Sequence, residues 1–139
     1  MPDRPAQPLA ASPSAPAAEA AIDRLQGMAD DVRGCAILDP EGAVLAASGP
    51  RERWGLAASG LLAAADAAAG EPATEVHVAT EEGEAFAVRE RGFAIVAAAE
   101  RFTLASLMLT DMRAVLRGVV RSAPAAEASA ARSVARDEA

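Results

Sequence analysis

Apolar side chains recur at helical spacing in three segments of the chain, which are residues 17–28, 50–69 and 103–121. In the first segment the apolar positions at helical spacing are Ala21, Ile22, Leu25 and Met28. The second begins at Pro50, which suits a helix start, and stops at Gly70, which is typical of a helix end. All three segments are predicted to be helices.

Shorter apolar or alternating runs separate these helices, and turn residues bound each of them. The run at residues 32–38 ends at Asp39-Pro40-Glu41-Gly42, where proline in the second position and glycine in the fourth suit a type I turn. Further strands are predicted at residues 43–47, 75–80, 85–89 and 93–98. The predicted order of elements is therefore α-β-β-α-β-β-β-α.

The connections between the last three strands are short, which requires these strands to be antiparallel neighbours. The strands are almost continuously apolar, and three helices do not fit on one face of a five-stranded sheet. We therefore predict an α/β (α+β) domain with a central five-stranded antiparallel sheet that is covered on both faces.

The two ends of the chain differ in composition from its middle. Residues 1–16 hold five of the nine prolines and are predicted to be a disordered arm. Residues 122–139 are rich in alanine with scattered charges, and are predicted to be a disordered or frayed helical tail. The domain is assigned to residues 17–121.

Composition narrows the classes of function. A net charge of -7 argues against binding to nucleic acid or to an anionic membrane. The sequence shows neither a secretory signal nor a long uncharged apolar stretch, so a cytoplasmic protein is expected. Arginine and alanine are abundant and lysine is absent, which is typical of a bacterial gene rich in G and C.

The elements resemble the Roadblock/dynein light chain family, a branch of the longin-like superfamily, over residues 17–121. The resemblance is carried by GCAILDPEGAVLAAS at residues 34–48, by the three strands within residues 75–99, and by RFTLASLMLTDMRAVLRGV at residues 101–119. One departure is the loop Glu100-Arg101-Phe102, where the family often has a polar segment that contains glycine.

The resemblance implies one helix on one face of the sheet and two on the other. It also implies a homodimer or heterodimer in which the third strands pair and the middle helices pack together. Members of the family scaffold or regulate Ras-like small GTPases, and bacterial members act as their GTPase-activating partners.

The residues themselves also favour dimerisation. The strand at residues 75–80 is expected at a sheet edge, and it carries neither the proline nor the lysine that would block pairing. The middle helix offers small residues that permit close helix approach. Trp54 is interpreted as a helix anchor against the sheet, or alternatively as a partner contact. The predicted dimer or partner interface comprises Trp54, Ala57, Ala58, Leu61, Ala65, Val76, His77 and Val78.

No residue pattern predicts a catalytic, cofactor or metal site. Cys35 lies in an apolar strand, which favours a buried thiol over a redox sensor. His77 is the only histidine and has no partner at metal spacing, and the acidic run at residues 81–84 is interpreted as a solvated hairpin turn. Four arginines are candidates for an arginine finger that would reach into a GTPase: Arg51, Arg53, Arg89 and Arg91. The alternative interpretation of Arg89 and Arg91 is that they occupy solvated turn positions.

The sequence therefore predicts a non-catalytic dimeric interaction module that regulates or scaffolds a Ras-like small GTPase, with itself or a paralogue as its dimer partner. The alternative is a profilin-like or PAS-like small-ligand sensor with a pocket between sheet and helix. An enzyme is the third hypothesis, and the absent catalytic motifs argue against it.

Overall fold

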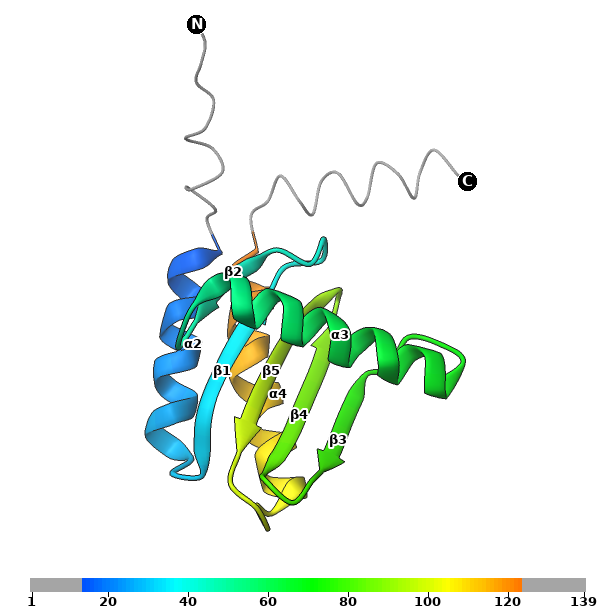
Figure 1. Cartoon of the computed structure of the whole chain (residues 1–139). Coiled ribbons are helices and arrows are strands. Elements are labelled where there is room, and N and C mark those ends of the chain that lie inside the picture. Colours follow the sequence, from blue (N-terminus) through cyan, green and yellow to red (C-terminus); the bar gives the residue numbers. More distant parts are fainter. Residues whose placement is uncertain (1–13, 124–139) are drawn as a thin grey trace, which may run out of the picture.

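The computed structural model describes residues 14–123, which contain three helices and five strands (Figure 1). The elements are α2 (Ala15–Met28), β1 (Val32–Leu38), β2 (Val44–Ala47), α3 (Arg51–Ala69), β3 (Glu75–Ala79), β4 (Glu84–Glu90), β5 (Phe93–Ala99) and α4 (Ala105–Arg121). This order confirms the prediction, although α2 begins at Ala15 rather than at residue 17. The predicted arm and tail, except for residues 14–16 and 122–123, lie outside the described residues.

The strands form one fully antiparallel sheet in the order β2-β1-β5-β4-β3, which confirms the predicted fold class. The connection through α3 carries the chain from the β2 edge to the β3 edge, and β5 then returns to the centre to pair with β1. In the described part of the chain β3 pairs only with β4. The strand predicted to be an edge is therefore an edge.

Two tight turns explain why neighbouring strands pair directly. Arg91 and Gly92 connect β4 to β5 with φ values of 52° and 86°, and two positive φ values are typical of the type I′ hairpin that suits twisted strands. Between β1 and β2, the Asp39 carboxylate accepts hydrogen bonds from the backbone N–H groups of Glu41 and Ala43, both at 2.9 Å. Gly42 in this turn has a φ of 90°, which glycine adopts without strain.

The helices divide unequally between the two faces of the sheet, as Figure 1 shows, with α2 and α4 on one face and α3 on the other. The core under α2 and α4 contains the large side chains, among them Leu25, Ile37, Phe86, Ile95, Met112 and Leu116. The core under α3 is smaller and rich in alanine: Ala36, Leu38, Ala58, Leu62, Ala87, Ala94 and Val96. One face is therefore thickly covered and the other thinly.

Cys35 lies in the thickly covered core and is fully buried, which confirms the interpretation of a buried thiol. Its backbone N–H donates to the Ser48 hydroxyl at 2.8 Å, so this serine extends the β1–β2 ladder. Burial raises the pKa of the Cys35 thiol to about 11, with a smaller contribution from Asp23. The thiol is therefore protonated at neutral pH.

We predict that Phe86→Ala lowers the free energy of unfolding by about 3–5 kcal/mol, because the Phe86 ring is fully buried. Phe102→Ala is the matched control: Phe102 is 83% exposed, so its loss should change stability by less than about 0.5 kcal/mol. Urea unfolding of both variants at one protein concentration gives the two values. Similar losses for the two variants would contradict this account of the core.

We also predict that Cys35 resists alkylation by iodoacetamide in the folded protein at neutral pH. The species that reacts is the thiolate. Burial raises the pKa of the thiol, so that little thiolate forms, and it also keeps the reagent away from the sulfur. Mass spectrometry should show an unmodified native chain and a singly alkylated chain in denaturant. Rapid modification of the native chain would show that the strand opens or that the thiol is activated.

Candidate partner-binding face

Helix α3 is fixed to the sheet at both of its ends. At its start the Arg51 guanidinium donates to the carbonyl oxygens of Val44 at 2.8 Å and Leu45 at 3.3 Å, both on β2. At its end Gly70 adopts a φ of 76° and donates its N–H to the Asp66 carbonyl oxygen, which confirms the predicted stop. The helix crosses the sheet between these points, close to β1 and β2 (Figure 1).

The Asp66 carboxylate makes the second attachment. Both of its oxygens accept from the Arg89 guanidinium of β4, at 2.7 and 3.0 Å, and one also accepts from the Ala73 N–H at 2.8 Å. These hydrogen bonds, that of Arg89 first, lower the pKa of Asp66. The interpretation of Arg89 as a solvated turn residue is therefore wrong, because Arg89 lies within β4 and ties it to the end of α3.

Trp54 anchors the first half of α3. A Cβ atom placed on Gly34 of β1 would lie 3.0 Å from the Trp54 ring and 3.0 Å from the Ser48 hydroxyl. Glycine gives the closest fit at this position, because with any larger residue the ring or the hydroxyl would have to shift by a few tenths of an ångström. Trp54 is half-buried and packs against the smaller core, as the anchor interpretation requires.

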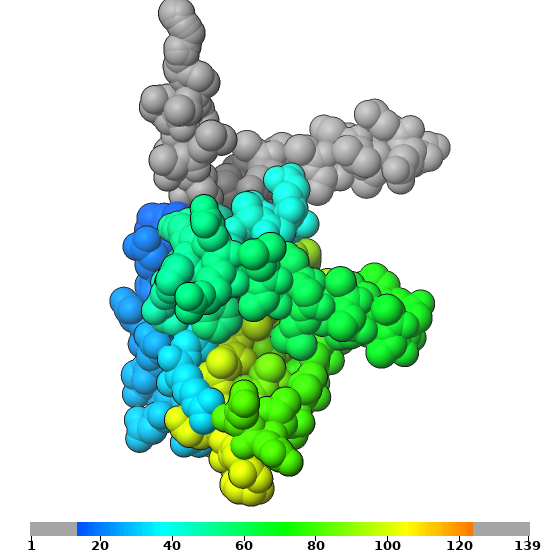
Figure 2. Space-filling view, viewed as in Figure 1, coloured from blue at the N-terminus to red at the C-terminus, as the bar shows by residue number. Residues whose placement is uncertain are grey.

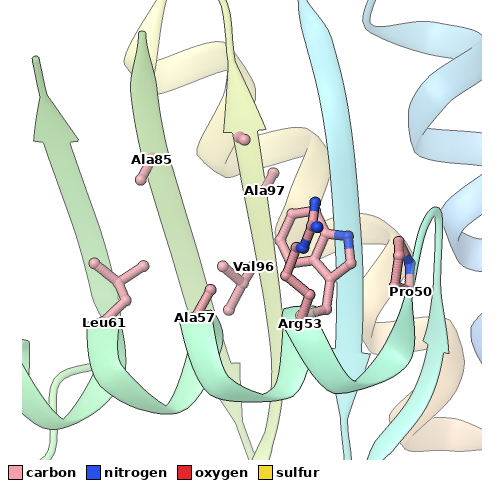
Figure 3. Close-up of a pocket in the computed structure, with 9 residues that line it drawn as sticks. Pro50, Arg53, Ala57, Leu61, Ala85, Val96 and Ala97 are labelled. Atoms are coloured by element: carbon pink, nitrogen blue, oxygen red, sulfur yellow. The ribbon is translucent and has the colours of Figure 1, made fainter. Parts of the chain in front are cut away.

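Beside this ring, a hollow of about 370 Å³ opens between α3 and the strands β4 and β5 (Figure 3). Figure 2 shows these strands uncovered beneath the helix. Apolar side chains line the hollow from both layers, and Arg53 is its one charged residue. The nine lining residues are Pro50, Arg53, Trp54, Ala57, Leu61, Ala85, Val96, Ala97 and Ala98.

The orientation of α3 about its own axis buries some of the predicted interface residues against the sheet and leaves others exposed. Ala58 is fully buried against the sheet, Leu61 and Ala65 are half-buried, and Ala57 is exposed at the hollow. The outward stripe of the helix is instead formed by Leu56, Gly60, Ala63, Ala64 and Ala67. Leu56 is 80% exposed and was missed, although its spacing to these small residues is helical.

The edge strand β3 presents different residues to the two faces. Val76 packs against the smaller core, and Val78, on the same face, is 40% exposed. His77 points to the other face, where its ring stacks on Phe86 at 4.5 Å. The predicted interface residues of β3 therefore share the backbone edge but not one face.

A hydrogen bond and an ion pair hold β3 from the α4 side. His77 Nε2 lies 2.8 Å from Glu84 Oε1, and Arg113 of α4 pairs with Glu75. The hydrogen bond to His77 is the largest cause of the lowered pKa of Glu84, and the N–H of Phe102 adds to it. The edge strand is thus well positioned while its outer backbone edge remains unpaired in the described structure.

The described residues contain no group of three histidine, cysteine, aspartate or glutamate side chains placed to hold a metal ion. None of the helices within residues 14–123 is long and apolar enough to cross a membrane. Glu81 and Glu82 are exposed in the β3–β4 turn, as interpreted. The interpretation is wrong for Glu84, which begins β4 and has a side chain that is only 8% exposed. What the face of α3 and the outer edge of β3 do present is an apolar lining and unpaired backbone groups.

No family model and no curated protein matches the sequence, but solved structures resemble the fold. The Roadblock/LC7 domain from Streptomyces avermitilis is 18% identical with a TM-score of 0.63, and the match covers 73% of this chain and 92% of that one. The gliding protein MglB from Thermus thermophilus is 15% identical with a TM-score of 0.65, covering 79% and 90%. Myxococcus xanthus MglB is 13% identical with a TM-score of 0.62, covering 77% and 87%. The chain therefore has the fold of Roadblock/LC7 domains, as the sequence resemblance implied.

Proposed function

We propose that this chain is a non-catalytic, dimeric interaction module that regulates or scaffolds a Ras-like small GTPase in the bacterial cytoplasm. The observation that carries the proposal is the unpaired edge of β3 beside a thinly covered sheet face. An apolar edge strand is a template for pairing, and Val78 on this edge is 40% exposed. A second copy or a paralogue that supplies its own β3 would satisfy the backbone groups of both edges.

A twofold axis at the middle of β3 accounts for several features together. Antiparallel pairing about His77 would extend the five-stranded sheet of each chain across the axis. It would place Val76 and Val78 of both chains on the face of α3. The outward stripe of α3, from Leu56 through Gly60 and Ala64, would then lie beside its counterpart, since small residues permit close helix approach.

The GTPase part of the proposal rests on the family resemblance and on the shared fold with MglB. The residues of the face support a binding role, because they offer apolar contacts rather than a nucleophile and a base. Of the four arginine-finger candidates, Arg51 and Arg89 are engaged in hydrogen bonds, and Arg53 stands at the hollow. Arg53 and Arg91 stay candidates for an arginine finger, but the family resemblance implies that regulation acts through the partner's own catalytic groups.

One observation favours the alternative of a small-ligand sensor. The hollow of about 370 Å³ beneath α3 falls within the size range of small-molecule sites, which begins at roughly 300 Å³. Its lining is apolar apart from Arg53, whereas specific ligand sites usually carry several placed polar groups. The interaction module is therefore the better supported function.

We predict that light scattering at micromolar concentration gives twice the 14.1 kDa mass of one chain. Val78→Arg should reduce this to a single-chain mass, because it places a long charged side chain at the paired edge. Met28→Arg is the matched control: Met28 is 48% exposed at the end of α2, away from β3, and should leave the dimer intact. A single-chain mass for the unaltered protein, or a dimer that survives Val78→Arg, would contradict the proposed interface.

We further predict that the tagged chain of 139 residues captures a Ras-like GTPase from its native lysate when a GTP analogue is present, and less of it with GDP. Leu56→Asp should lower the amount captured by about tenfold, because it puts a charge on the outward stripe of α3, where the two helices of the proposed dimer meet, and so disturbs the dimer that offers the binding face. Leu104→Asp is the control, since Leu104 is 65% exposed near α4 on another part of the surface. Mass spectrometry identifies and quantifies the captured protein.

The absence of any GTPase in both nucleotide states, with folded and dimeric bait, would contradict the regulator proposal. A metabolite screen by thermal shift then becomes the measurement that separates a ligand sensor from a scaffold.

A further inference from the structure

A second exposed apolar surface lies where the end of α2 meets the start of α4. A hollow of about 260 Å³ opens there, and its apolar lining includes Met28, Leu104 and Leu107. Three carboxylates share the lining with these side chains: Asp30, Asp31 and Asp111. This surface belongs to the α2–α4 side of the sheet and takes no residue from α3 or β3.

Large apolar side chains are concentrated here to a degree that the fold does not require. Six large apolar residues are exposed in residues 14–123, and three of them line this hollow. Met28 is 48% exposed, Leu104 65% and Leu107 54%. A fourth, Phe102, is 83% exposed in the loop that leads to Leu104. Clustering of this kind marks an interaction surface, whereas scattered apolar residues do not.

Local structure also works against stability at two of these positions. Phe102 has a φ of 64°, in the left-handed region that bulky side chains rarely adopt. Leu104 occupies the N-cap of α4 and makes no side-chain hydrogen bond to the helix, where serine, threonine or aspartate would make one. Residues that stabilise the domain poorly and remain exposed are better explained by contact with another molecule.

The loop that carries Phe102 is nevertheless held firmly. Glu84 accepts the Phe102 N–H at 2.6 Å, and the Arg33 guanidinium donates to both oxygens of Glu100 at 2.9 and 3.0 Å. The Glu100 N–H donates to the Asp31 carbonyl oxygen at 2.9 Å, which joins the loop to the segment after α2. A surface fixed before binding loses less conformational entropy when a partner binds.

Charge identifies the kind of partner. None of the ion pairs formed within residues 14–123 uses Asp30, Asp31 or Asp111, and no arginine lines the hollow. A second copy of this chain would bring its own carboxylates against these three, and an anionic membrane or nucleic acid would be repelled in the same way. A cationic partner with apolar anchors complements both features of the hollow.

We propose that this hollow binds an amphipathic helix of a partner protein, with leucine-like side chains on one side and arginine or lysine residues flanking them. The apolar anchors would contact Met28, Leu104 and Leu107, and the flanking cations would pair with Asp30, Asp31 and Asp111. This is the helix-in-groove mode of recognition, in which anchors repeat every three or four residues. The site is separate from the dimer edge and from the α3 face.

The test uses the full chain and a synthetic helical peptide of leucine and lysine, labelled for fluorescence anisotropy. A peptide with the same leucines and glutamate in place of lysine is the charge control. The leucine–lysine peptide should bind and the leucine–glutamate peptide should not. The double variant Leu104→Ser/Leu107→Ser should weaken binding at least about tenfold, as loss of buried anchors does at other interfaces.

Further variants test whether the aspartates of the hollow, rather than the overall negative charge of the chain, attract the peptide. Asp30→Asn/Asp31→Asn/Asp111→Asn should weaken binding about tenfold and flatten its dependence on salt, because the attraction to lysine is screened by salt. Glu41→Gln/Glu52→Gln/Glu71→Gln removes three exposed charges elsewhere and should leave binding within about twofold, as should Leu56→Ser. Since every altered side chain is exposed or borders the hollow, thermal unfolding should confirm that each variant folds.

Methyl NMR of the methionines gives a measurement that needs no variant. Peptide binding should shift the Met28 methyl signal and leave that of the fully buried Met112 unchanged. The proposal is overturned if the leucine–lysine peptide fails to bind, if both peptides bind alike, or if the hollow variants bind as the unaltered chain does. It is also overturned if Leu104→Ser/Leu107→Ser changes the mass of the protein in solution, because the occupant would then be a second copy.

Discussion

The rest of the structure depends on how the three inner strands distribute large and small side chains between the two faces of the sheet. Successive residues of a strand point to opposite faces, so one run of sequence supplies both cores. In β4, Phe86 and Val88 enter the core under α2 and α4, while Ala87 between them faces α3. In β5, Phe93 and Ile95 alternate with Ala94 in the same way. Two helices are needed to cover the larger side chains, and one helix rests on the smaller.

The thin core beneath α3 explains why this helix needs fixed attachments. Burial of alanine removes little apolar area from water, so the helix gains less stability from packing than α4 does. Its anchors are therefore specific: Trp54 over Gly34 at one end, and the Asp66–Arg89 pair at the other. The same thin coverage leaves β4 and β5 open beneath the helix (Figure 2). The open face is thus a consequence of the alternation that builds the main core.

The sequence predicted the elements well because proline, glycine and alternation mark their limits. Gly70 ended α3 and the Arg91-Gly92 pair closed the β4–β5 hairpin at the expected places. The side of α3 that contacts the sheet could not be predicted, because alanine, glycine and leucine are distributed almost evenly around the helix. Ala58 was consequently assigned to the dimer or partner interface although it is fully buried against the sheet, and Leu56 was missed. Arg89 was misplaced for a different reason, because its partner Asp66 is distant in sequence and meets it only in the folded chain.

The two proposed surfaces are connected through one carboxylate. Glu84 Oε1 lies 2.8 Å from Nε2 of His77 on the edge strand. Glu84 Oε2 accepts a hydrogen bond from the N–H of Phe102 at 2.6 Å. Its side chain is only 8% exposed, and both contacts favour its charged form, which is why its pKa is lowered. One ionised group thus positions both the strand offered for dimerisation and the loop that leads to the α2–α4 hollow. Because the edge strand and this loop both contact Glu84, partners bound at the two surfaces would be held at a defined separation, which is the physical requirement for a scaffold.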